Sequence, residues 1–343
     1  MAAIGVAATM ALTGCSGSGD GPEKEASGSS ASPGSLAPLN IVHAAKGEPA
    51  LPPDMPSVAG DPSKAPALEI GGAVLRADGS ATYPLDAYQR VENQKTLTKA
   101  VNILAGSCMK TKGFEYPARL HEVPHIRVND PAAIHGVVNL DSAKVNGYRS
   151  TGSEGLQRLG LVDPEAVNGR EPTKEERETA RGQQGAPPEP GKQGCIGEAR
   201  ATLEGALADQ AADHVIALAV EADVRAREDS RVKQAVSKWS ACMKAAGFDY
   251  ENPRDPGRDK SMLGKGLAVP AGAQLAPPSP FEINVAATDI GCKRTSLYLE
   301  TATAVTAAYQ KDLIEKNAQQ LHQNDQTWTK VLQGANKILA SGR

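Results

Sequence analysis

The sequence contains the same short segment twice. Residues 108–116 are Cys-Met-Lys-Thr-Lys-Gly-Phe-Glu-Tyr, and residues 242–250 are Cys-Met-Lys-Ala-Ala-Gly-Phe-Asp-Tyr. A run with helical spacing leads into each copy, over 101–112 and 232–246, and a second cysteine follows in a Gly-Cys pair, at Cys195 and at Cys292. The sequence therefore predicts an internal duplication, in which each unit is a helix, a loop and a second helix, with one cysteine on each helix.

The repeated segment also predicts how its helix ends. Glycine adopts the left-handed conformation just past a helix without steric cost, and the residue after it packs back on the last turn. With Gly247 in that position, Phe248 is expected to lie against Met243. The same count applies to the first copy, with Gly113, Phe114 and Met109. We interpret both pairs as core packing and not as a ligand site.

Four cysteines besides Cys15 are present, and they are predicted to form two disulfides. Four cysteines allow three pairings. The duplication favours Cys108 with Cys195 and Cys242 with Cys292, because each unit then carries its own bridge. A cysteine metal site is disfavoured, since the close Cys-x-x-Cys spacing is missing.

The composition favours a mainly all-α fold with a thin core. Only 3% of the 343 residues are aromatic, and the chain has 34 glycines and 24 prolines. The net charge is −3, and there is no basic run with interleaved aromatic residues. Nucleic acid is therefore a poor candidate partner.

The first fourteen residues carry no charge and end Leu12-Thr13-Gly14-Cys15. This pattern resembles the lipobox of bacterial lipoproteins, in which the cysteine is acylated and becomes the N-terminus after cleavage. We therefore expect residues 1–14 to be a signal peptide and Cys15 to be lipidated, with the true start upstream because no positive segment precedes the apolar run. Residues 15–65 are rich in Gly, Ser and Pro and are predicted to form a flexible tether.

Beyond the tether, two helical units are predicted, over 66–228 and 229–343. Residues 73–83 contain Asp78-Gly79 and predict a small β-hairpin. Helical spacing predicts helices over 91–112, 173–181, 195–227 and 232–246, and from about 289 to the end, with Asp229-Ser230 as a cap. Two loops rich in Pro and Gly, over 117–193 and 251–287, separate them, and the first is the preferred place for a binding function.

The last helix carries a heptad seam. Its positions alternate by four and three residues: Ile314, Ala318, Leu321, Asp325, Trp328, Leu332, Ala335 and Leu339. Asp325 is the exception to the otherwise nearly apolar pattern. We expect the seam to pack on the protein's own helices, and the alternative is a coiled coil with a second chain.

One local pattern suggests a metal-dependent enzyme. Residues 121–125 match the H-E-x-x-H pattern of zinc peptidases, and His135 could add a third ligand. That pattern binds zinc only when a helix places His121 and His125 on one face, and Pro124 opposes a helix there. A chance match is therefore preferred, and no metal or cofactor is predicted. His214, on an apolar helix face, is interpreted as a satisfied histidine and not as a ligand.

The tether and its lipobox, together with residues 239–250 and Asp289-Ile290-Gly291-Cys292, resemble uncharacterised lipoproteins of Streptomyces and related actinobacteria. In such sequences a Cys-Met-x-x-x-Gly-aromatic-x-Tyr segment is paired with a later cysteine helix. The resemblance covers most of the mature chain, although Ala105 stands where the second copy has Trp239. It implies a location at the envelope and implies no enzymatic activity.

These patterns predict a lipid-anchored, extracytoplasmic protein of the cell envelope that binds and does not catalyse. Its expected partners are the membrane, through the N-terminal lipid, and an envelope protein such as a transporter or an enzyme, or a cell-wall polymer. The alternatives are a metal-dependent envelope hydrolase and a helical spacer that oligomerises through its C-terminal seam.

Overall fold

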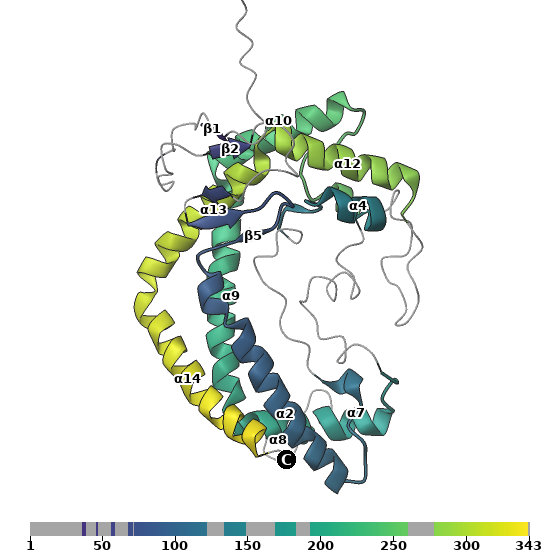
Figure 1. Ribbon diagram of the computed structural model, residues 1–343, viewed down its shortest axis with the longest axis vertical. Coiled ribbons are helices and arrows are strands. Elements are labelled where there is room, and N and C mark those ends of the chain that lie inside the picture. Colours follow the sequence, from purple (N-terminus) through teal and green to yellow (C-terminus); the bar gives the residue numbers. More distant parts are fainter. Residues whose placement is uncertain are drawn as a thin grey trace, which may run out of the picture.

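The computed structural model describes residues 36–38, 46, 56–58, 68–70, 72–121, 134–148, 169–182, 193–259 and 278–341. Within these residues the protein is mainly α-helical, as the sequence predicts, and it is elongated (Figure 1). The predicted signal peptide, Cys15 and most of the predicted tether lie outside the described residues. None of the described helices is long and apolar enough to cross a bilayer.

Two small antiparallel sheets come first in the chain. Strands β1 (Leu36–Pro38) and β2 (Pro56–Val58) form one, and β3 (Leu68–Ile70), β4 (Ala73–Leu75) and β5 (Ala81–Thr82) form the other, in that order. The turn between β4 and β5 contains Gly79 at φ 80°, where a Cβ would lie 2.7 Å from Val138. The predicted hairpin is therefore confirmed, and β3 extends it by a strand that was not predicted.

The first unit, residues 66–228, supplies the following helices, most of them in the predicted places. They are α1 (Asp86–Gln89), α2 (Val91–Thr111), the 3-10 turn η2 (Ala118–Leu120), α4 (Leu140–Asn146), α7 (Lys174–Arg181), α8 (Gly194–Thr202) and α9 (Gly205–Glu228). The prediction of a single helix over 195–227 was wrong, because Glu204 adopts the left-handed conformation, at φ 54°, and separates α8 from α9.

The second unit, residues 229–343, contains α10 (Ser230–Ala245), the 3-10 turn η3 (Pro256–Arg258), α12 (Pro280–Thr295), α13 (Tyr298–Lys316) and α14 (Ala318–Ala340). Asp229 caps α10, as predicted, by accepting a hydrogen bond from the amide of Arg231. Helix α12 starts nine residues before the predicted 289, because Ser279 caps it and Pro280 occupies its first turn, where a missing N–H costs nothing.

Both repeated segments end their helices in the predicted way. Gly113 and Gly247 have φ 83° and 89°. The amide of Phe114 donates to the carbonyl of Met109 at 3.0 Å, and that of Phe248 donates to Met243 at 2.9 Å. These are the long hydrogen bonds of a Schellman motif. Each phenylalanine packs against the cluster that contains the methionine of its own copy.

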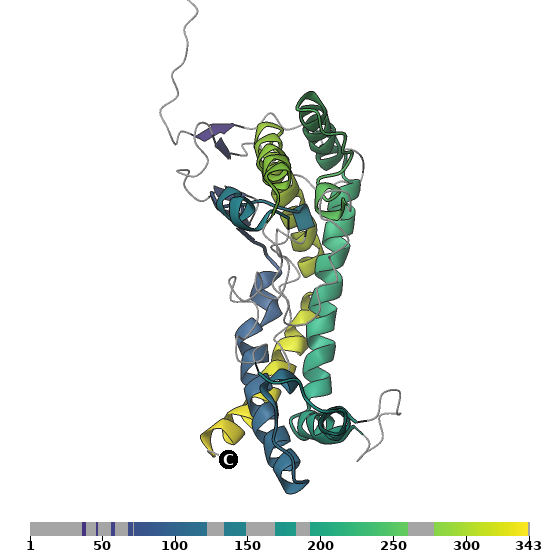
Figure 2. The ribbon, with the colours of Figure 1, turned by 90° about the vertical axis from the view of Figure 1, so that its right-hand side faces the viewer.

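The two predicted disulfides are present. Cys108 pairs with Cys195 between α2 and α8, and Cys242 pairs with Cys292 between α10 and α12. The two bridges lie at opposite ends of the long axis, and α9, α13 and α14 run between these ends (Figure 1 and Figure 2). In both units a left-handed residue, Glu204 or Leu297, follows the second cysteine helix, and a long helix begins directly after it. The duplicated frame is thus visible in three dimensions.

The packing is shared between the two halves of the chain. The cluster around Cys195 contains Trp328 and Val331 of α14, and the cluster around Cys292 contains Val137 and Tyr148 from the first loop. A third cluster joins the β3–β5 sheet to α9, α10 and α13. The first loop is therefore partly core, because α4 packs on α12 and α7 packs on α8.

The C-terminal helix α14 packs on α2 and α9 of its own chain. Its buried positions are Leu321, Asn324, Trp328, Val331 and Ala335. The buried stripe is therefore close to the predicted seam, but it includes 324 and 331 in place of 325 and 332, and Ala318 is exposed. Asp325 lies at the edge of the stripe and accepts from the guanidinium of Arg90 at 2.7 Å.

Candidate functional site

Helix α12 buries two charged side chains that lie one helical turn apart. Asp289 and Lys293 are both 0% exposed. Val285, Ala286 and Ile290 are buried on the same part of the helix, so the face that carries the two charges points into the core. Packing of this apolar face therefore takes the two charges into the interior together.

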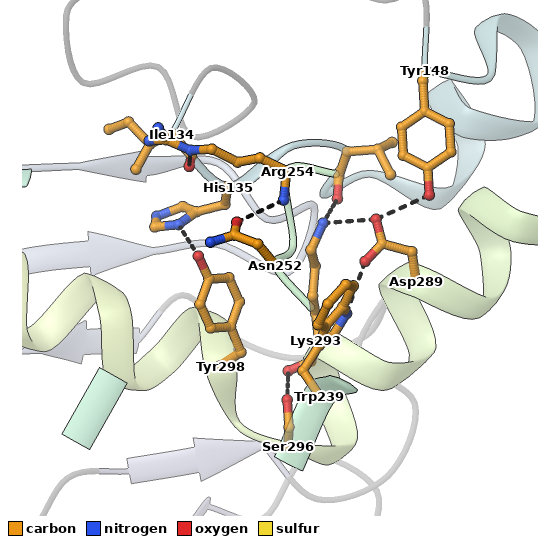
Figure 3. A network of polar contacts seen from close by, with 11 residues as sticks. Ile134, His135, Tyr148, Trp239, Asn252, Arg254, Asp289, Lys293, Ser296 and Tyr298 are labelled. Atoms are coloured by element: carbon orange, nitrogen blue, oxygen red, sulfur yellow. Dashed lines mark hydrogen bonds and ion pairs between the residues drawn. The ribbon is translucent and has the colours of Figure 1, made fainter. Parts of the chain in front are cut away.

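Each charge finds partners inside the protein (Figure 3). The Lys293 ammonium donates to Asp289 Oδ2 at 2.8 Å and to the carbonyl of Val137 at 2.8 Å. The indole N–H of Trp239 donates to Asp289 Oδ1 at 2.9 Å, and the hydroxyl of Tyr148 donates to Oδ2 at 3.1 Å. The network joins α10, α12 and the first-loop segment 134–148.

Burial has the largest effect on the pKa of each of these groups. It raises the pKa of Asp289 and lowers the pKa of Lys293, and in each case the opposite charge of the partner resists the shift. Burial and the nearby Asp289 raise the pKa of Tyr148, so its hydroxyl remains a donor throughout the neutral range. The pair is thus held by mutual attraction against a large desolvation cost.

A second contact fixes the end of the first-loop segment on α12. The buried carboxylate of Glu282 accepts from the amide of Tyr148 at 3.0 Å. Gly147 has φ 57°, and a Cβ there would lie 2.1 Å from Glu282 Oε1. Only glycine allows the backbone to pass this close to the carboxylate. The start of the segment is held by Arg254, whose Nε donates to the carbonyl of Ile134.

His135 occupies the interior beside this network and not a metal site. Its Nδ1 lies 3.1 Å from the hydroxyl of Tyr298, and its Nε2 lies 3.4 Å from the hydroxyl of Tyr83. Burial, followed by the positive charges of Lys293 and Arg254, lowers the pKa of His135 to about 3. The imidazole is therefore neutral at physiological pH, and both of its nitrogens face tyrosine hydroxyls.

His121, the first residue of the H-E-x-x-H pattern, is not helical. His121 follows η2 with an extended backbone, at φ −60° and ψ 134°, and its ring stacks on Tyr116. Glu122 and His125 lie outside the described residues. Since His135 is enclosed by tyrosines, it is not available as a third ligand, and the part of the chain that is described holds no metal-binding group of three or more His, Cys, Asp or Glu residues.

The other residues predicted from the sequence are His214 and the four paired cysteines, and each of them contacts other parts of the fold. His214 is half-buried, and its Nδ1 lies 3.0 Å from the side-chain amide of Asn324, which agrees with a satisfied histidine. In each disulfide one cysteine is buried, Cys195 or Cys292, and the other, Cys108 or Cys242, is half-buried.

No role was predicted for Asp289 and Lys293 from the sequence. A signal was present, because positions 285, 286, 289, 290 and 293 share one helical face that is otherwise apolar. A charge at such a position must be paired once it is buried, and the spacing of four residues allows the pair. The contact with Tyr148 comes from 141 residues away and has no local signal.

This arrangement joins chain segments, and its charged groups do not face solvent. A solute would have to open the packing between α4, α10 and α12 to reach Asp289 or Lys293. No protein-family model, no curated protein and no solved structure matches the chain.

Proposed function

We propose that the protein is a lipid-anchored, extracytoplasmic binding protein of an actinobacterial cell envelope, with no catalytic activity. The observation that carries the proposal is the state of the cysteines, because all four that follow the Leu12-Thr13-Gly14-Cys15 pattern are joined in disulfides. Disulfides of this kind persist outside the cytoplasm and are rare within it. The lipobox pattern points to the same compartment.

Binding is favoured over catalysis because, among the described residues, the charged groups of the Asp289 and Lys293 network do not face solvent. Asp289 and Lys293 are both 0% exposed, His135 is 3% exposed, and all three are enclosed by partners. A binding protein needs a stable surface, and two disulfides with an internal ion pair serve that need. The partners proposed are a transporter, an envelope enzyme or a cell-wall polymer.

Anchoring is tested by the variant Cys15→Ala in a bacterial host that processes lipoproteins, with Ser16→Ala as the matched control. We expect the wild type and Ser16→Ala to fractionate with membranes and to carry a lipid-sized mass increase on the peptide that begins at Cys15. Cys15→Ala is expected to lose both properties. If Cys15→Ala stays in the membrane fraction and its mass shows no lost lipid, the anchoring proposal is wrong.

The binding role is tested by cross-linking in intact envelopes, followed by recovery of the anchored protein. Recovery of one stoichiometric envelope protein or polymer, lost when the tether is cleaved, is the expected result. Hydrolysis of an envelope substrate by the purified protein would contradict the non-catalytic part of the proposal.

A further inference from the structure

The junction between α12 and α13 concentrates several constraints in nine residues. It begins with Cys292 of the second disulfide and Lys293 of the ion pair. Leu297 then adopts the left-handed conformation, at φ 55°, although it is not glycine. Tyr298 contacts His135. A non-glycine residue in this conformation costs about 1 kcal/mol, so the surrounding packing must hold the junction in place.

Glu300 lies on the first turn of α13, directly after this junction. Its side chain is buried, with 7% of the residue exposed. One carboxylate oxygen accepts from the backbone amide of Glu300 itself, and the other, Oε2, is buried without a hydrogen-bond partner. An ionised carboxylate in such a place loses its hydration and gains little in return.

Few charges act on this carboxyl group. Arg294, on the last turn of α12, favours the ionised form, but burial outweighs it and raises the pKa of Glu300 to about 7. Lys293, the other cation on that turn, is bound to Asp289. Among the described residues, no other charge acts on the Glu300 carboxyl group. This includes the charges on the other elements that pack on α13, which are α9, α10, α14, β3 and β4.

We propose that Glu300 makes the junction between α12 and α13 responsive to pH: the neutral carboxyl group keeps the first turns of α13 packed, and its ionisation loosens them. The exposed carboxylate is hydrated when the turn opens, whereas the packed one is not. Opening therefore becomes easier as the pH rises. This device is independent of the partner that the protein binds.

The test is native-state hydrogen exchange on the full, disulfide-bonded protein between pH 5.5 and 8.0, with rates corrected for the intrinsic dependence of exchange on pH. A carboxyl group with a pKa of about 7 when packed and 4.5 when exposed raises the opening constant by about 25-fold over this range. We expect that rise, for the amides of residues 301–306, in the ratio of the wild-type opening constant to the opening constant of Glu300→Gln. Opening of this turn also frees His135 from Tyr298, so the effect of Glu300 is given by the ratio of the wild-type opening constant to that of Glu300→Gln; Glu315→Gln, an exposed site on the same helix, should behave as the wild type.

A direct titration keeps the proposal testable even if Glu300→Gln folds poorly. The carboxyl carbon of Glu300 in the wild-type protein should titrate by NMR with a midpoint near 7. A midpoint below 5 would overturn the proposal. So would a ratio of opening constants, wild type to Glu300→Gln, that does not change with pH.

Discussion

The buried pair of Asp289 and Lys293 makes the sharpest prediction about stability. We consider Asp289→Asn, Lys293→Met and the double variant. Asparagine retains the shape and an acceptor for the indole of Trp239, and methionine retains most of the volume of the lysine. Each single change leaves one buried ionisable group without its partner, whereas the double change removes both charges.

The expected loss of stability follows from the burial of the pair. Both side chains are 0% exposed, and the two charged atoms lie 2.8 Å apart. Removing one member of a buried ion pair costs about 3 to 5 kcal/mol, because the remaining charge must lose its ionisation or remain unpaired in the interior. Replacing both members by groups of similar shape costs much less than the sum. We therefore expect a coupling free energy of about 3 kcal/mol between the two positions.

The assay is urea unfolding at pH 7 with both disulfides intact, analysed as a double-mutant cycle. Helix α13 provides a matched control, because Asp312 and Lys316 have the same order and spacing, with the charged atoms 2.7 Å apart. This pair is solvated, with side-chain exposures of 34% and 62%. Asp312→Asn and Lys316→Met should each cost about 0.5 kcal/mol or less.

Two results would contradict the predicted coupling between Asp289 and Lys293. Single variants at 289 and 293 that each cost less than about 1 kcal/mol would mean that the interior solvates an unpaired charge well. Strictly additive costs would mean that the two residues act separately, although their charged atoms are in contact.

Two further predictions concern the second disulfide and His135. Replacing Cys242 and Cys292 together by alanine should lower the free energy of unfolding by about 4 kcal/mol, since the bridge closes a loop with a sequence separation of 50. A loss below about 1 kcal/mol in urea unfolding would contradict this prediction. The folded-state pKa of His135, about 3, lies below its ordinary value of 6.5, so its contribution to stability is complete above pH 6.5 and is lost as the pH falls towards 3. Between pH 6.5 and 4.5 the wild type should therefore lose about 2 kcal/mol more than His135→Gln, and equal losses in urea unfolding at the two pH values would exclude this role.

The sequence predicts best those features that a few neighbouring residues determine. The Schellman motifs at Gly113 and Gly247, the cap at Asp229 and the turn at Gly79 each depend on one residue type at one position. The cysteine pairing was predictable for a different reason, because the duplication repeats the order of helix, loop and helix. Local chemistry and the repeat together therefore predict the helices, the hairpin and both bridges.

The features that were missed depend on tertiary packing. Glu204 and Leu297 adopt left-handed conformations that their residue types disfavour, so no local pattern predicts the breaks that they make. Asn324 replaces Asp325 in the buried stripe of α14 because its amide reaches the carbonyl of Ala211 and the ring of His214, both on α9. The sequence of α14 alone does not reveal this partner.

The first loop explains why the two disulfide units form one structure. Helix α7 packs on α8, beside the first bridge, and α4 packs on α12, beside the second, although both come from the segment between Cys108 and Cys195. In return α14, from the second half, covers the cluster around the first bridge. Each bridge closes a loop within its own unit, yet each unit completes its core with an element from the other half. Reduction of either bridge should therefore weaken packing at both ends of the molecule. The hydrogen bond from the Lys293 ammonium to the carbonyl of Val137 is one of the contacts that join the second unit to the first-loop segment.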